Sequence, residues 1–185
     1  MGAGGLCGRR RLIHLNGAPG IGKSTLAARY AAEHPGTMAV ELDTLRTWVG
    51  GWRVGDHNLL LAVRSAGLAL CSAWLQSGHD VVLPQLVARA DHIDWLTDVA
   101  GRAGADFVEL VLLDDRDDAV RRFGMRGGQG GPDHVADVVV PADAELLGYH
   151  DALVAGVASW PAAIAVRSRA GDPEQTYAAV LAVLA

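Results

Sequence analysis

The sequence predicts an α/β protein of one domain, in which a five-stranded parallel sheet lies between two layers of helices. Short, almost fully apolar runs alternate with helical patterns along the chain of 185 residues, and strands that are buried on both faces read as such runs. The first apolar run leads into a glycine-rich turn and then a helix, which is the setting of a phosphate-binding loop. The domain is expected to span residues 1–185, with residues 1–10 as a flexible tail and residues 121–135 as a lid.

The elements of the first half are assigned from apolar runs and from helical spacing that ends at glycine. In chain order they are the strand Arg11–Asn16, the helix Lys23–His34, the strand Thr37–Leu42 ending at Asp43, a short helix from Thr44 to Gly50-Gly51, the helix His57–Gln76, which Ser77-Gly78 closes, and the strand Asp80–Leu83.

The second half continues the alternation and contains a glycine-rich interruption. Its expected elements are the helix Asp91–Ala103, the strand Phe107–Leu113, the helix Asp115–Arg126, the mobile loop Gly127–Asp133, the helix Asp143–Ser159, the strand Ala163–Val166 and the helix Pro173–Leu184. Asp91 and Asp172 are the expected helix caps, and Pro173 suits a first helical position. Because ligands of parallel sheets bind outside the carboxyl ends of the strands, we expect the glycine-rich turn, Asp43, Pro84-Gln85 and Asp114-Asp115 to meet at one edge.

Residues 17–25 read Gly-Ala-Pro-Gly-Ile-Gly-Lys-Ser-Thr, which fills every fixed position of the phosphate-loop pattern G-x-x-x-x-G-K-S. The glycines let successive N–H groups point at phosphate oxygens, and the following helix N-terminus adds partial positive charge. Lys23 is expected to reach the β- and γ-phosphates, and the Ser24 hydroxyl to ligate Mg²⁺. A glycine-rich turn that matches by chance is the alternative, and the flanking strand and helix argue against it. We therefore expect ATP and Mg²⁺ as cofactors, bound through Gly17, Ala18, Pro19, Gly20, Ile21, Gly22, Lys23, Ser24 and Thr25.

Asp43 is the first candidate for catalysis, because a carboxylate at the end of the second strand should emerge on the same edge as the phosphate loop. There it could accept the proton of an acceptor hydroxyl or hold Mg²⁺ through water. The alternative is a helix cap, since a helical pattern follows at once.

Three arginines, Arg121, Arg122 and Arg126, precede the glycine-rich loop and are candidates for contact with phosphate. Arginines that a closing lid brings in can stabilise the charge of phosphoryl transfer, and Arg122 and Arg126 share one helix face. Surface ion pairs are the alternative for part of this set, because Asp117 and Asp118 stand four residues before Arg121 and Arg122.

The remaining candidates are assigned to an acceptor site. The third strand is followed by proline and Gln85 rather than by an acid, and an amide can orient a hydroxyl or a water but is a poor Mg²⁺ ligand. The alternative for Gln85 is a surface turn after the strand. The helix His57–Gln76 has one polar stripe on an otherwise buried surface, which is either a solvent face or a lining for the acceptor. Trp48 and Trp52 either stack on a ring-bearing acceptor or pack in the core. The expected acceptor residues are Arg46, Trp48, His57, Arg64 and Gln85.

Composition excludes several other classes of function. The net charge of −5 argues against a nucleic-acid partner, and no apolar run is expected to be long and uninterrupted enough to span a bilayer. Three arginines at 9–11 precede one short strand, so a secretion signal is not expected. Two cysteines in unrelated contexts, Cys7 and Cys71, indicate neither a disulfide framework nor a metal site. We expect a cytoplasmic protein, a monomer or a homodimer, with no membrane partner.

The phosphate loop, the aspartate after the second strand and the arginines before a short lid resemble the small P-loop kinases of the adenylate-kinase-like and shikimate-kinase-like type. The stretch Val-Glu-Leu-Asp-Thr-Leu at 40–45 is most similar to the antibiotic-modifying branch, which includes chloramphenicol phosphotransferase and the tunicamycin-resistance ATP-binding proteins. The resemblance implies a three-layer P-loop NTPase fold with strand order 2-3-1-4-5 and Asp43 as the base. It also implies adenine near residues 168–172 and a stacking arginine at Arg121 or Arg122. The chain departs from the pattern in lacking an acid after the third strand and a second aspartate beside Asp43.

Together these features predict an ATP-dependent phosphotransferase that transfers the γ-phosphate to a hydroxyl of a small molecule, such as an antibiotic or a nucleoside-like compound. The alternatives are a regulatory P-loop ATPase or switch and a toxin-like kinase of a nucleotide sugar. The sequence does not name the acceptor, because residues from several segments set a pocket.

Overall fold

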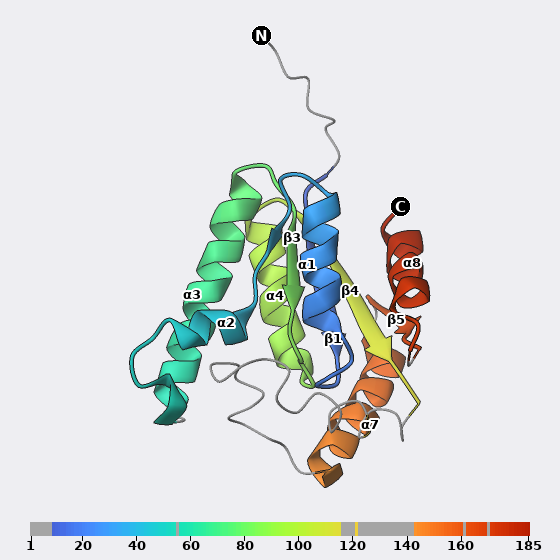
Figure 1. Cartoon of the computed structure of the whole chain (residues 1–185). Coiled ribbons are helices and arrows are strands. Elements are labelled where there is room, and N and C mark those ends of the chain that lie inside the picture. Colours follow the sequence, from blue (N-terminus) through green and yellow to red (C-terminus); the bar gives the residue numbers. More distant parts are fainter. Residues whose placement is uncertain (1–8, 55, 116–120, 122–142, 161, 170) are drawn as a thin grey trace.

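The computed structural model of the protein describes residues 9–54, 56–115, 121, 143–160, 162–169 and 171–185. Its strands are β1 (Arg11–Gly17), β2 (Met38–Ala39), β3 (Val81–Pro84), β4 (Asp106–Leu113) and β5 (Ala163–Arg167) (Figure 1). Its helices are α1 (Lys23–Glu33), α2 (Leu42–Thr47), the 3-10 turn η1 (Trp52–Val54), α3 (His57–Gln76), α4 (Ala90–Arg102), α7 (Asp143–Ser159) and α8 (Pro173–Leu184). The expected helix Asp115–Arg126 lies mostly, and the loop Gly127–Asp133 entirely, outside the described residues.

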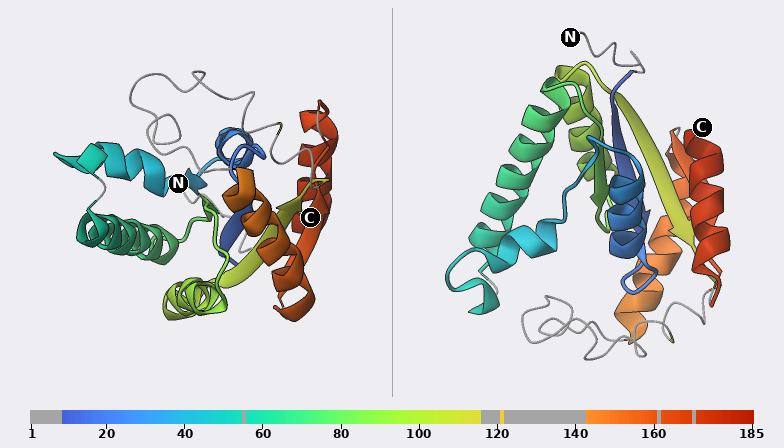
Figure 2. Two further views of the ribbon diagram at one scale, coloured as in Figure 1. Left: turned by 90° about the horizontal axis from the view of Figure 1, so that it is seen from below. Right: turned by 45° about the horizontal axis from the view of Figure 1, so that its top comes forward.

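The five strands form one parallel sheet with the order β2-β3-β1-β4-β5, which confirms the expected topology. Helices α1 and α8 cover one face, and α3, α4 and α7 cover the other (Figure 2). Neighbouring residues of β1 serve the two layers in turn: Leu12 belongs to the core under α3 and α4, whereas Ile13 belongs to the core under α1 and α8. Both side chains are fully buried, as expected for the central strand of a sheet covered on both faces.

The segment after β2 differs from the expectation. The strand was expected to run to Leu42, but its ladder ends with the bond from the Val40 N–H to the Val82 carbonyl (2.9 Å), and α2 begins at Leu42. The reason is the packing of Leu42, which joins the core under α3; a Cβ on Gly67 would lie 2.1 Å from the Leu42 Cδ2 atom. Asp43 is therefore in the first turn of α2 and does not end a strand.

Helix α3 has the expected bounds, but the expectation that it is buried outside one polar stripe was wrong. Only Val63, Gly67, Cys71 and Leu75 are buried, so one narrow line of the helix faces the core. Among the described residues, α3 is the one helix long and apolar enough to cross a membrane by length and composition, which the sequence analysis did not expect. One helix of this kind is by itself weak evidence for a membrane span.

Two helix starts show which expected caps form. Asp172 caps α8, because its carboxylate accepts the Gln175 N–H at 2.9 Å. Asp91 does not cap α4, which begins after Arg89; its carboxylate instead pairs with the Arg89 guanidinium at 2.8 Å. That guanidinium lowers the pKa of Asp91.

A polar cluster joins α1 to α8 at the surface. The Arg29 guanidinium lies 2.9 Å from a Glu33 carboxylate oxygen, 2.6 Å from Glu174 and 4.0 Å from the centre of the Tyr177 ring. The Tyr177 hydroxyl donates to Glu33 at 2.7 Å. The hydrogen bond from Tyr177 and the bond from Arg29 lower the pKa of Glu33, and burial together with that hydrogen bond raises the pKa of Tyr177 to about 12.

Candidate active site

The phosphate loop connects β1 to α1 at the carboxyl edge of the sheet, and two of its glycines are required by geometry. Gly17 has φ +155°, and a Cβ there would lie 2.9 Å from the Ile21 side chain and 3.1 Å from the Leu112 carbonyl oxygen. Gly22, directly before α1, has φ +101°, a conformation that side chains disfavour. The loop therefore turns tightly against β4 and brings the N-terminus of α1 to the sheet edge, where its backbone N–H groups suit an anion.

The two side chains expected to act on phosphate, Lys23 and Ser24, are the first two residues of α1, directly after this turn. The Lys23 ammonium donates to the carbonyl oxygens of Gly17 (2.9 Å) and Ala18 (3.0 Å), so it lies folded over the loop. The Ser24 hydroxyl donates to the carboxylate of Glu41. An ammonium group suits a phosphate oxygen, and a hydroxyl oxygen suits Mg²⁺.

Glu41 is a site residue that the sequence analysis missed. It stands directly before α2, and its second carboxylate oxygen accepts from the Thr44 hydroxyl at 2.9 Å, which fixes the side chain facing Ser24. A hydroxyl and a carboxylate are the hard oxygen donors that Mg²⁺ takes, usually together with phosphate and water. Ser24 and Glu41 therefore fit the magnesium ion that the phosphate loop implies. The signal in the sequence was the acid two residues before Asp43.

Asp43 lies two residues beyond Glu41 and is exposed. It lies in the first turn of α2, a helix that packs on α3. This position is compatible with the predicted base but differs from the strand end from which that role was argued.

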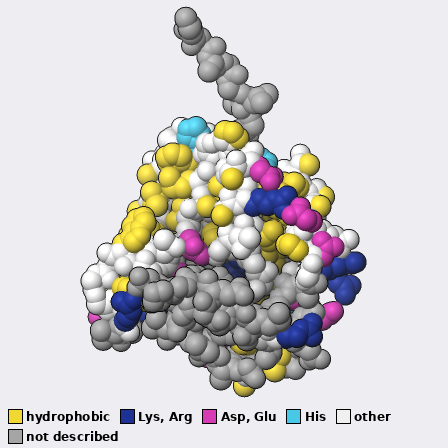
Figure 3. Space-filling model, in the orientation of Figure 1, with side chains coloured by type: hydrophobic (Ala, Val, Ile, Leu, Met, Phe, Trp, Pro, Cys, Tyr) yellow, Lys and Arg dark blue, Asp and Glu magenta, His cyan; other side chains and the backbone are white. Residues whose placement is uncertain are grey.

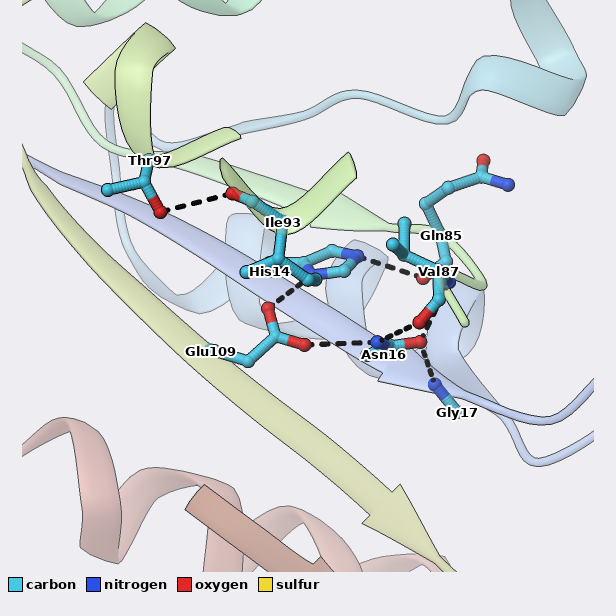
Figure 4. A network of polar contacts seen from close by, with 8 residues as sticks. All are labelled: His14, Asn16, Gly17, Gln85, Val87, Ile93, Thr97 and Glu109. Atoms are coloured by element: carbon cyan, nitrogen blue, oxygen red, sulfur yellow. Dashed lines mark hydrogen bonds and ion pairs between the residues drawn. The ribbon is translucent and has the colours of Figure 1, made fainter. Parts of the chain in front are cut away.

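A buried polar network ties the phosphate loop to the segment after β3 (Figure 4). His14 and Asn16 of β1 and Glu109 of β4 are all fully buried. The Asn16 amide oxygen accepts the N–H groups of Gly17 (2.8 Å) and Val87 (2.9 Å). Its amide nitrogen donates to the Val87 carbonyl (2.7 Å) and to Glu109 (3.0 Å), so every hydrogen-bonding position of the amide is filled. One side chain thus holds the first glycine of the loop and Val87 together.

His14 extends the network to Gln85. Its Nε2 atom lies 2.9 Å from the Gln85 carbonyl oxygen, so this nitrogen must carry a proton, because a carbonyl only accepts. Its Nδ1 atom pairs with the Glu109 carboxylate, and that contact requires a second proton between nitrogen and oxygen. The network was missed in the sequence analysis, although polar residues at 14, 16 and 109 in otherwise apolar strands were a usable signal.

A large cleft of about 710 Å³ opens between α3 and α4. Its lining is mostly apolar and comes from α2, α3, β3, the segment after β3 and α4; it consists of Leu42, Leu61, Arg64, Ser65, Leu68, Ala69, Ser72, Leu83, Gln85, Leu86, Val87, His92, Trp95, Leu96, Asp98, Val99 and Arg102. Leu42 and Val87 connect it to the site described above, since one precedes Asp43 and the other is bonded to Asn16.

The structure brings only part of the expected acceptor residues to this cleft. Arg64 and Gln85 line it, whereas His57 is exposed at the start of α3 and is not in the lining. Trp48 is 75% exposed, so it is not a core residue. Arg46 is buried, donates to the Trp52 carbonyl at 3.1 Å and does not line the cleft.

The other expected site residues lie at the margin of what the structure describes. Arg121 is exposed, whereas Arg122 and Arg126 lie outside the described residues, so their contact with phosphate stays a prediction. Near the expected adenine position, the buried Ser168 donates its N–H to the Leu113 carbonyl at 2.7 Å, which joins this loop to the end of β4.

Comparisons with known proteins agree with this geometry. The family model described as an AAA domain matches residues 12–142, and no curated protein matches the sequence. A candidate kinase from Chloroflexus aurantiacus J-10-fl is similar over 96% of this chain and 98% of its own, with 19% identity and a TM-score of 0.70.

Two further solved structures resemble the chain at similar coverage. The tunicamycin resistance protein of Deinococcus radiodurans has 15% identity over 95% of this chain and 96% of its own, with a TM-score of 0.58. Shikimate kinase from Bacteroides thetaiotaomicron has 18% identity over 95% and 97%, with a TM-score of 0.60. These likenesses show the fold, and the match over residues 12–142 shows that the chain belongs to the family described as an AAA domain.

Proposed function

We propose that the protein is an ATP-dependent phosphotransferase that transfers the γ-phosphate to a hydroxyl group of a small molecule. The observation that carries the proposal is the junction of two sites: the phosphate loop and the cleft between α3 and α4 share the segment that Asn16 holds. A hydroxyl at the inner end of the cleft would face a γ-phosphate on the loop, and such positioning is a large part of catalysis by kinases.

Each residue then has a chemical task. Lys23 would leave the loop carbonyls to hold the β- and γ-phosphates, and the N–H groups of the loop would hold the remaining phosphate oxygens. Ser24 and Glu41 would hold Mg²⁺, which supplies charge neutralisation when bound. Asp43 would accept the proton of the attacking hydroxyl. The lid arginines Arg121, Arg122 and Arg126 remain candidates for contact with the transferred phosphate.

The neighbours' names bear on the acceptor only as suggestions. One is a tunicamycin resistance protein and another is a shikimate kinase, so both an antibiotic and a small polyol are open under this proposal. A regulatory ATPase or switch is the rival from another class, and the large cleft beside the phosphate loop favours the kinase, because a switch needs a partner surface rather than an acceptor pocket.

Three variants test the assigned tasks. Lys23→Ala should slow ATP turnover by roughly 100-fold or more, because a preorganised charge at the transferred phosphate is lost. Asp43→Asn should slow transfer by roughly 10²–10⁴ and leave ATP–Mg²⁺ affinity near that of wild type. Glu41→Gln should instead weaken ATP–Mg²⁺ binding, because a metal ligand is lost.

Turnover of Lys23→Ala within threefold of wild type would refute the phosphate site. If Asp43→Asn keeps full turnover, Asp43 is not the base; if it loses ATP–Mg²⁺ affinity along with rate, Asp43 rather than Glu41 serves the metal.

A further inference from the structure

We propose that the acceptor is a hydroxylated molecule with an apolar body, and that this body lies in the cleft between α3 and α4. The inference rests on the proposed function, since it names the substrate class of the same site. It separates acceptors built on aromatic, alicyclic or aliphatic frameworks from small polyols.

The inner end of the cleft adjoins the reaction site. Val87 lines the cleft, and both its N–H and its carbonyl bond to the amide of Asn16, at 2.9 and 2.7 Å. The same amide oxygen accepts the Gly17 N–H at 2.8 Å. One side chain therefore separates the cleft wall from the first residue of the phosphate loop. A molecule that fills the cleft can place one terminal hydroxyl at the phosphate.

The walls of the cleft suit an apolar body. Leu68 and Ala69 of α3 face Trp95, Leu96 and Val99 of α4, with Leu83 of β3 among the lining. A hydroxyl pressed against such walls gives up its hydrogen bonds to water, which weakens binding by about tenfold for each unpaired group. A polyol carries several hydroxyls and would lose this factor repeatedly, whereas an aromatic or aliphatic framework gains from the same contact.

The size and the edge of the cleft agree with this class. About 710 Å³ is the volume of a site for a drug-sized ligand. Polar lining residues include Gln85 next to β3 and the exposed Arg64, Asp98 and Arg102, which can bond to the few polar groups of the ligand. His92 and Trp95 both line the cleft, and their rings stack with centroids 4.6 Å apart. Trp95 is 49% exposed, so an aromatic ligand can extend the stack.

Apolar side chains are also exposed on α3, and one of them lines the cleft. Leu61, which lines the cleft, is 41% exposed, and Figure 3 shows hydrophobic side chains gathered on the surface over α3. Contiguous apolar surface beside a pocket is typical of a binding site. A bound apolar body would cover part of this surface.

A series of alkyl β-glucosides tests the inference without the natural acceptor. Methyl, butyl, hexyl and octyl glucoside share one sugar head, so only the apolar part changes. Binding is measured by isothermal titration calorimetry without nucleotide, below the concentration at which each glucoside forms micelles. Each CH₂ group that is buried should strengthen binding by up to about fourfold. We expect octyl glucoside to bind at least tenfold more tightly than butyl glucoside.

Filling the cleft should abolish this dependence on chain length. Ala69→Trp places a ring in the cleft, and Ser72→Trp does so one turn away, which serves if the first variant melts early. Ala66→Trp is the matched control, because Ala66 is an exposed alanine of the same helix that does not line the cleft. The inference is overturned if affinity does not rise with chain length, or if Ala69→Trp and Ser72→Trp bind as Ala66→Trp does.

The proposed function can fail separately. These titrations contain no ATP, so they test the ligand class alone. If a separate assay with ATP finds no phosphate transfer, the kinase is refuted and the ligand class stands. Conversely, transfer to a polyol at an undiminished rate by Ala69→Trp would overturn the ligand class and leave the kinase standing.

Discussion

Replacing Glu109 with leucine or with glutamine should have very different costs, because the buried network can rearrange around one and not around the other. In Glu109→Leu the amide of Asn16 loses one acceptor and the Nδ1 atom of His14 loses its partner. Each of these two buried polar groups left without a partner costs about 1–3 kcal/mol, so we expect a loss of about 2–6 kcal/mol in the free energy of unfolding.

Glu109→Gln offers a substitute for both bonds. Its amide oxygen can accept from Asn16, while its NH₂ group donates to the Nδ1 atom of a neutral His14 whose Nε2–H still reaches the Gln85 carbonyl. One amide N–H is left over, so the expected cost is about 1–2 kcal/mol.

Urea unfolding followed by tryptophan fluorescence measures both variants, and the double variant His14→Leu/Glu109→Leu completes a cycle. Since two apolar groups replacing a buried pair cost less than the loss of either partner, the double variant should lose less than the sum of the two single variants. Equal stability of Glu109→Leu and Glu109→Gln, or strict additivity in the cycle, would refute the hydrogen-bonding scheme.

Two further predictions concern stability. Gly101→Ala in α4 should stabilise the protein by about 0.5–1 kcal/mol, because nothing lies within 4 Å of the added Cβ. Gly67→Ala in α3 should have a free energy of unfolding at least about 1 kcal/mol lower than that of Gly101→Ala, because the Leu42 side chain must move. Equal urea midpoints for the two variants would contradict the packing of α2 on α3. The lowered pKa of Glu33 means that its ionised form is stabilised by folding. Its contribution is therefore full above the ordinary pKa of 4.5 and declines as the pH falls below it. The difference in Tm between wild type and Glu33→Gln should be constant from pH 7 to pH 5 and shrink toward pH 3, and a difference that widens on acidification would contradict this sign.

The strand order was expected from the resemblance to the small P-loop kinases, and the structure has it. The alternation of strands and helices and the phosphate loop could be predicted from the residues themselves, because both depend on local signals: apolar runs, helical spacing and fixed glycine positions. The position of Asp43 could not, because the apolar run Val40–Leu42 does not reveal that Leu42 turns away to pack on Gly67 of another helix. Glu41 was missed for the same reason, since its approach to Ser24 depends on where α2 begins.

The cleft and the buried network could not be predicted either, because both depend on contacts between segments that are far apart in the sequence. His14, Asn16 and Glu109 stood out as polar residues in apolar strands. That they form one network follows from the pairing of His14 with Glu109 across β1 and β4, which the sequence does not show. The cleft depends on the spacing between α3 and α4, which no local pattern encodes. Arg64 was predicted to line it from one polar stripe, whereas His57, on the same stripe, lies outside it.

The most direct test of the central claim is to measure whether a phosphate moves from ATP to a hydroxyl. The protein is incubated with ATP and Mg²⁺ and with a panel of hydroxylated compounds that includes polyols, nucleosides and antibiotics, and each compound is then analysed by mass spectrometry. We predict that at least one compound gains the mass of one phosphate with the wild type and not with Lys23→Ala. If ATP is consumed at one rate with and without every compound, and no compound gains phosphate, the protein is an ATPase or switch and the proposed function is wrong.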